Sequence, residues 1–444
     1  GGCLAVRAPD LSAPSPRPVQ TPVVEGEPID WPARWGDETG AGKGALIDIE
    51  DGFDWRPLRY GPNHEGRPKS RDLQRVRRLA VGRIGPAGYR FQMEGPGGYV
   101  WVPDAERALA SGKPPDRSAH RRTDALERDT LVFVSGRRTR ASSEQPHIQI
   151  ERTWMQTLMP RGDTPRGVVV LIPGLYGTPR FLFRGIAECM AEDGWAVLRL
   201  LAPPSRFMER HEIPLLPSSA DASARAAAEW FDNRFAETAY AVEAGLRDLE
   251  DRYPAAAGGP LALVGISGGA LATPAVAARL TEVGDGPPDA AVMVAGAEHA
   301  LEMTARSAYT SWIDAVRFRW PDQRKGEVLP PDEFVDAFRE PYMKATKLDP
   351  GRVAWALEDS EVLLVHGRRD TAVPAYLGDR LWLRLGRPER WEAPAGHLEL
   401  VFRLWMSKDR LVHWLDRTLP RAHDEPAESA GAETRDAPAD GEPA

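Results

Sequence analysis

Residues 261–270 read LALVGISGGA, and this stretch decides the fold. Apolar residues fill most of its first half, as is typical of a buried β-strand. Its second half consists of small residues around one serine, Ser267. A strand that ends in Gly-x-Ser-x-Gly and precedes a helical pattern predicts a sharp strand-to-helix turn that holds the serine hydroxyl clear of the sheet. The flanking glycines fit this prediction, because larger side chains there would collide with the strand or the helix.

Further apolar segments with the length of strands recur along the chain. They lie at residues 131–135, 147–160, 167–173, 195–203, 260–266, 290–296 and 361–367. Helical patterns separate the later segments, and this alternation predicts a mostly parallel central sheet with helices on both faces. Right-handed crossovers would then bring the carboxyl ends of the strands to one edge of the sheet, where functional sites form.

Two titratable side chains follow later apolar strands, as Ser267 follows its own. Asp370 lies in LLVHGRRDTAVP, and His397 lies 27 residues further on in WEAPAGHLEL. A serine hydroxyl is a poor nucleophile unless a base takes its proton, and the base needs an acid to orient it. Glu298, beyond the strand at 290–296, is a second candidate for that acid. His366 lies within a strand, where we expect it to pack or bond locally.

The order Ser267, Asp370, His397, each at a strand end, resembles the α/β-hydrolase superfamily of serine esterases and lipases. The resemblance covers about residues 127–420 and implies a Ser-His-Asp triad that acts through an acyl-enzyme. It also implies an oxyanion hole formed by the backbone N–H groups of Gly268 and of Leu175. The family often has His-Gly in that second loop. Here the loop reads PGLYG, and Tyr176 is an alternative contact for the substrate.

The function that the resemblance implies is hydrolysis of a small-molecule carboxylic ester. Two alternatives stay open: a serine peptidase or acyltransferase of the same fold, and a surface-tethered binding protein without catalysis. The sequence shows no metal-ligand cluster and no nucleotide-binding motif, so we expect no metal and no cofactor. The elbow presents a serine where dehalogenases use a carboxylate, which disfavours that chemistry.

Some fifty residues separate the strand at 290–296 from the next one, and we expect a helical cap at about 298–350. Aromatic residues are frequent there, and they allow two interpretations. They could line an apolar substrate site, or they could form the small core of the cap itself. These residues are Tyr309, Trp312, Phe318, Trp320, Phe334, Phe338 and Tyr342.

The ends of the chain differ in composition from the middle. Residues 1–30 hold six prolines and predict a flexible tether. Residues 31–126 contain four tryptophans and are expected to be an accessory region that packs on the hydrolase domain at 127–421. Residues 422–444 carry a net charge of −6 out of the formal −8 and predict a disordered acidic tail. The remaining net charge of −2 gives no electrostatic case for binding nucleic acid.

The sequence begins Gly-Gly-Cys, which resembles the end of a bacterial lipoprotein signal. This resemblance implies a lipid on Cys3 and an extracytoplasmic, membrane-anchored protein. The alternative interpretation is that these three residues have no role in processing. No apolar run is long enough for a transmembrane helix. We therefore expect membrane contact only through a lipid anchor at Cys3.

Overall fold

The computed structural model describes residues 28–32, 45–49, 126–139, 147–160, 164–174, 180–200, 211–310 and 316–419. Several predictions fall outside these residues. They concern Cys3, Leu175, Tyr176, Trp312, most of the tether at 1–30, most of the accessory region at 31–126, and the acidic tail at 422–444.

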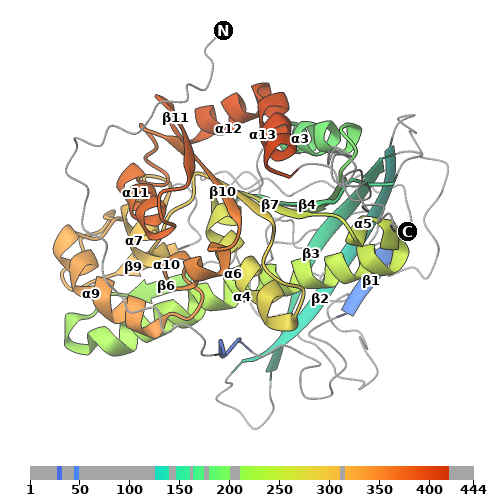
Figure 1. Cartoon of the computed structure of the whole chain (residues 1–444). Helices are drawn as coiled ribbons and strands as arrows, with labels where there is room; N and C mark the ends of the chain where they lie inside the picture. The colour runs from blue at the N-terminus through green and yellow to red at the C-terminus, as the bar shows by residue number, and fades with distance from the viewer. Residues whose placement is uncertain are drawn as a thin grey trace, which may run out of the picture.

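The centre of the molecule is a nine-stranded sheet in the order β1-β2-β3-β5-β4-β7-β8-β10-β11 (Figure 1). Strands from β5 to β11 in this order are parallel, whereas β1, β2 and β3 are antiparallel to their neighbours. The predicted mostly parallel sheet is therefore confirmed. The strands are β1 (Ala45–Ile49), β2 (Leu126–Thr139), β3 (His147–Pro160), β4 (Val168–Ile172), β5 (Ala196–Leu200), β7 (Leu261–Ile266), β8 (Ala290–Val294), β10 (Glu361–Gly367) and β11 (Glu389–Ala393).

Helices cover both faces of this sheet (Figure 1). Helices α3, α12 and α13 pack together over one face, and α4 and α6 lie on the other. The helices are α3 (Arg180–Glu192), α4 (Ala220–Arg252), α5 (Pro254–Ala257), α6 (Gly268–Val283), α7 (Ala300–Arg306), α9 (Asp332–Ala345), α10 (Pro350–Val353), α11 (Ala375–Arg384), α12 (His397–Met406) and α13 (Lys408–Thr418).

The central parallel strands consist almost entirely of apolar residues because helices cover both of their faces. Every residue of β4, β5 and β8 is buried. This burial fixes the sheet at the middle of the molecule. The carboxyl ends of β7, β10 and β11 consequently meet at one edge of the sheet. Ser267 follows β7 directly, and Asp370 and His397 lie a few residues beyond the ends of β10 and β11.

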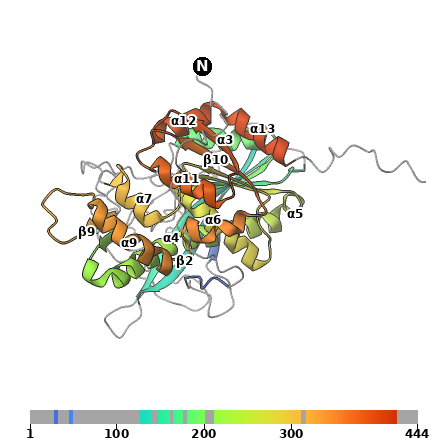
Figure 2. The same cartoon turned by 60° about the vertical axis from the view of Figure 1, so that its left-hand side comes forward.

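The cap is built from two separate segments, whereas the sequence analysis expected one helical insertion. A short strand, β9 (Val316–Arg319), lies between α7 and α9 and pairs in parallel with β6 (His211–Pro214). Helix α4 has 33 residues, a length of about 50 Å, so it extends beyond the sheet and packs against α9. Figure 2 shows α9, β9 and the beginning of α4 on the same side of the molecule.

The cap aromatics divide between the two interpretations of the sequence. Phe318, Trp320, Phe338 and Tyr342 are buried in the continuous hydrophobic core, so they stabilise the cap itself. Tyr309 instead lies close to the predicted base, as described below. Among the described helices, none is long and apolar enough to cross a bilayer.

Residues 28–32 dock on the side of the molecule formed by α4 and α6. The backbone N–H of Ile29 donates to the Glu282 carboxylate at 2.8 Å, and the Trp31 indole N–H donates to the same carboxylate. The Tyr240 hydroxyl donates to the carbonyl of Pro32 at 3.0 Å. This short segment therefore binds to the hydrolase core through both polar and aromatic contacts.

Candidate active site

Ser267 occupies the turn between β7 and α6 in a backbone conformation that side chains rarely adopt. Its φ is 54° and its ψ is −117°, which is strained for any residue other than glycine. The backbone N–H of Ser267 donates to Val294 O at 2.7 Å, and its carbonyl accepts from Leu271 N at 3.1 Å. These bonds from β8 and α6 hold the strained residue in place at the edge of the sheet.

Three glycines let the backbone close around this serine. A Cβ on Gly265 would lie 2.2 Å from Thr273 Oγ1, and one on Gly269 would lie 2.2 Å from the carbonyl oxygen of Ile172. A Cβ on Gly174 would lie 3.0 Å from Ser267 Cβ. Both glycines of the Gly-x-Ser-x-Gly motif are thus required, because any larger side chain at these positions would collide with neighbouring atoms. Gly174 brings the loop after β4 against the serine, where the sequence predicted an oxyanion donor.

The structure brings Ser267, His397 and Asp370 together. His397 Nε2 lies 2.9 Å from Ser267 Oγ, and His397 Nδ1 lies 2.7 Å from Asp370 Oδ2. The side chain of Asp370 is fully buried and that of His397 is 8% exposed. All three residues follow parallel strands, so the topology of the sheet explains why their side chains meet at one edge.

The two oxygens of Asp370 have separate partners. Oδ1 accepts from the backbone N–H groups of Ala372 and Val373, each at 2.9 Å, and Oδ2 faces His397. A carboxylate that accepts at both oxygens makes His397 Nδ1–H the donor to Oδ2. His397 Nε2 is then left as an acceptor for the Ser267 hydroxyl proton, which is the tautomer that a general base requires.

Glu298, the second candidate for the acid, lies elsewhere. Its Oε2 accepts from Arg384 Nε at 2.7 Å, and its backbone N–H reaches the carbonyl of Leu377 on α11. This side chain therefore joins the end of β8 to α11 through a buried ion pair. Asp370, the acid of the predicted triad, contacts His397, whereas the alternative Glu298 does not.

The N-terminus of α6 faces the nucleophile. Gly268 is its first residue, directly after Ser267, so the backbone N–H of Gly268 lies in the first turn of a 16-residue helix. The free N–H groups and the positive end of the helix dipole favour negative charge there. Leu175 and Tyr176, the other residues predicted to surround the oxyanion, lie outside the described residues.

Tyr309 is a cap residue that contacts the predicted base, and no pattern in the sequence distinguishes it from the other cap aromatics. Its ring meets the His397 imidazole edge to face, with ring centroids 5.5 Å apart at 78°. The neighbouring Ala308 N–H donates to the carbonyl of Thr371 at 2.8 Å. Burial, followed by the charge of Asp370, raises the pKa of the Tyr309 hydroxyl. The cap therefore rests directly on the loop that carries Asp370.

A buried carboxylate, Glu302 on α7, joins the cap to α11. It accepts two hydrogen bonds from Arg339 at 2.8 Å each, one from Tyr376 at 2.9 Å and one from Arg380 at 3.0 Å. Burial alone would raise the pKa of Glu302, but the hydrogen bond from Arg339 and the charges of the arginines lower it to about 2. Glu302 is therefore an anion at all ordinary pH values. Its role is to hold α9 and α11 together.

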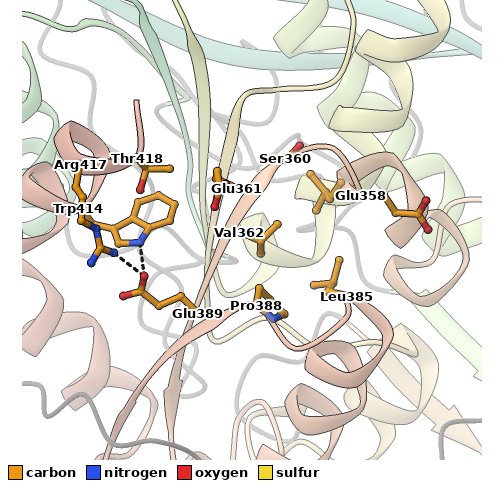
Figure 3. Close-up of a pocket in the computed structure, with 11 residues that line it drawn as sticks. Glu358, Ser360, Glu361, Val362, Leu385, Pro388, Glu389, Trp414, Arg417 and Thr418 are labelled. Carbon is orange, nitrogen blue, oxygen red and sulfur yellow. Dashed lines mark hydrogen bonds and ion pairs between the residues drawn. The ribbon is translucent and has the colours of Figure 1, made fainter. Parts of the chain in front are cut away.

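A separate cavity of about 410 Å³ opens at the opposite edge of the sheet. Its lining includes Glu361 and Glu389, which begin β10 and β11, so the length of a strand, about 20 Å, separates it from the triad. Figure 3 shows Trp414 and Arg417 bonded to the Glu389 carboxylate, at 3.0 and 2.6 Å. Within the described part of the chain, no group of three metal-binding side chains occurs.

No protein-family model and no curated protein matches the sequence. Solved structures similar to this chain include an esterase of Pyrococcus furiosus, at 16% identity over 64% of this chain and 92% of that chain, with a TM-score of 0.38. They include a cold-adapted esterase from an Arctic intertidal metagenomic library, at 14% identity over 65% and 94%, with a TM-score of 0.37. An acylaminoacyl peptidase of Pyrococcus horikoshii matches at 15% identity over 69% of this chain and 43% of that chain, with a TM-score of 0.39. Independently of these likenesses, the strand order and the serine elbow between β7 and α6 give this chain the α/β-hydrolase fold.

Proposed function

We propose that this protein is a serine hydrolase that cleaves a small-molecule carboxylic ester through an acyl-enzyme intermediate. The observation that carries the proposal is the position of His397, which lies 2.9 Å from Ser267 Oγ and 2.7 Å from Asp370 Oδ2. A fold alone does not require these three side chains at three strand ends. The contacts between these three side chains therefore support a catalytic role.

The first half of the proposed reaction forms the acyl-enzyme. His397 Nε2 takes the proton of Ser267 as its Oγ attacks the ester carbonyl carbon, and Asp370 stabilises the imidazolium that results. The negative charge on the carbonyl oxygen develops in front of the Gly268 N–H at the start of α6. Collapse of this intermediate breaks the bond to the alcohol oxygen, which leaves with the proton from His397.

The second half releases the acid. His397 takes a proton from a water molecule that attacks the acyl carbon, and the proton then passes to Ser267 Oγ as the acyl bond breaks. The serine and the neutral imidazole are restored. An amine or alcohol acceptor in place of water would make the same site an acyltransferase, and an amide substrate would make it a peptidase.

The test is labelling by a fluorophosphonate, which reacts with an activated serine. We expect labelling of the wild-type chain and none of Ser267→Ala or His397→Ala. Ser360→Ala serves as the matched control, because this serine lies just before β10, at the opposite edge of the sheet, where its hydroxyl donates to the carbonyl of Pro288 at 2.6 Å. This change should leave labelling unchanged. A folded wild-type protein that takes no label would refute the hydrolase and favour a binding protein. A panel of esters, peptides and acyl acceptors would then separate the three activities.

A further inference from the structure

Helix α12 carries an apolar stripe that faces solvent. Leu398, Phe402 and Met406 follow one another at intervals of four residues and are 57%, 42% and 55% exposed. Side chains four residues apart lie on one side of a helix, so the stripe runs along about 12 Å of it. The opposite side of the helix is buried in the core through Leu400, Val401 and Leu404. Three neighbouring exposed apolar side chains form a contiguous patch of a size that is often functional.

The stripe lies on the outside of the molecule and continues into an aromatic pair. Both views place α12 on the outer rim, beside α3 and α13 (Figures 1 and 2). The Phe402 ring packs against the ring of the half-buried Trp405, with centroids 5.5 Å apart. Leucine, phenylalanine and tryptophan on one side of a helix are the residues that enter the boundary between lipid headgroups and acyl chains.

Two exposed arginines lie beside the beginning of this helix. The backbone N–H groups of Arg368 and Arg369 donate to the carbonyls of Ala393 and Ala395, at 2.9 and 3.1 Å, just before α12 begins. The one negative charge of Glu399 on the helix is paired with Arg403 at 2.7 Å and also interacts with Arg369, so it does not offset all of this positive charge. The two arginines therefore add positive charge at one end of the stripe.

We propose that the α12 face, defined here as Leu398, Phe402 and Met406 with Arg368 and Arg369, docks onto an anionic lipid surface. The three apolar side chains expose on the order of 300 Å², well below the roughly 800 Å² that each partner buries in a stable protein interface. A lipid surface does not require shape complementarity, and its anionic headgroups attract juxtaposed arginines. Size and charge therefore both favour lipid over a second protein.

Docking in this orientation would place the beginning of α12 at the lipid surface and the triad on the core side of the same helix, where His397 is buried with Leu400 and Leu404. His397 is the first residue of α12 and directly precedes Leu398. The inference does not rest on the proposed function, because binding to lipid can be measured without any reaction.

The test is sedimentation of the full chain with vesicles of phosphatidylcholine alone or with 30% phosphatidylglycerol, a composition chosen at roughly physiological anionic content. All proteins carry Cys3→Ser, so that no lipid on this residue can contribute. We expect binding to the anionic vesicles that weakens with added salt. Phe402→Ser combined with Met406→Ser should weaken binding about tenfold or more, since two apolar side chains no longer enter the lipid. Arg368→Gln with Arg369→Gln should weaken binding to the anionic vesicles only.

The matched control is Val328→Ser combined with Leu329→Ser, which removes exposed apolar side chains (37% and 41% exposed) from the cap. This control should bind vesicles like the parent. Absence of vesicle binding by the parent would overturn the proposal, as would an equal loss of binding in the Phe402/Met406 variant and the Val328/Leu329 control. A parent that forms dimers by light scattering, and becomes monomeric with the α12 variants, would assign the face to a second copy instead. Circular dichroism of each variant serves to check that the fold is retained.

Discussion

At the scale of single residues, the site depends on the separate roles of the two Asp370 oxygens. Backbone N–H groups hold Oδ1, so that Oδ2 can face only His397. The residue types and their order were predictable from strand ends in the sequence. Asp370 was predicted as the acid, but the sequence left Glu298 open as an alternative because it also follows a strand. Only the side-chain partners of the two acids distinguish them.

Asp370→Asn should lower kcat for an activated ester by about 10⁴-fold, since an amide nitrogen at the Oδ2 position would favour the wrong tautomer of His397. Glu298→Gln should leave kcat per folded molecule nearly unchanged, although the loss of its pairing with Arg384 will reduce stability. Steady-state kinetics with active-site titration measures both. Equal losses of kcat in the two variants would contradict the assignment of the acid.

At the scale of helices and strands, apolar runs predicted the buried strands well. Each of β4, β7, β8 and β10 lies within one or two residues of its expected range, because burial on both faces requires continuous apolar sequence. Strands β1, β6 and β9 were not predicted. They have four or five residues each, and β6 and β9 pair across about a hundred residues of chain, so no local pattern marks them.

The cap helices were expected, but the buried Glu302 that joins them to α11 was not, because its partners are distant in sequence. Glu302→Gln should lower the free energy of unfolding by about 3 kcal/mol, since it leaves the buried guanidinium of Arg380 without its anion, whereas the partly exposed Arg339 keeps Asp336 as a partner. Urea unfolding measures this loss. Glu340→Gln is the control, because Glu340 pairs with Lys344 in a fully exposed position and should show no measurable change. Equal stabilities of the two variants would show that the buried network adds nothing.

At the scale of the whole molecule, stability should depend on pH through His366, which the sequence analysis expected to be a packed strand residue. Burial, followed by the charge of Arg390, lowers the pKa of His366 to about 4. The unfolded chain takes up a proton near pH 6.5, whereas the folded chain keeps this imidazole neutral down to about pH 4. Protons therefore favour unfolding, and stability falls as the pH drops through this window, by on the order of 3 kcal/mol.

The pH effect of His366 is isolated by comparing the wild type with His366→Leu. Burial raises the pKa of Asp232 to about 6, so its effect on stability is opposite to that of His366: stability rises as the pH falls. This effect is present in the wild type and in His366→Leu alike. Urea unfolding at several pH values between 7 and 4 should show a steeper loss of stability in the wild type than in the variant. The exposed His413→Gln should retain the wild-type slope. Parallel curves for wild type and His366→Leu would refute the assignment.

The pairing of β6 with β9 has a practical consequence for exchanging caps between enzymes of this fold. The strands come from residues 211–214 and 316–319, on either side of the segment that holds the nucleophile. Transplanting only the segment between β8 and β10 would leave β6 behind and bring a strand with no matching edge into the recipient. A chimera that is to change substrate preference must therefore move both segments together, with the first turns of α4, as one unit.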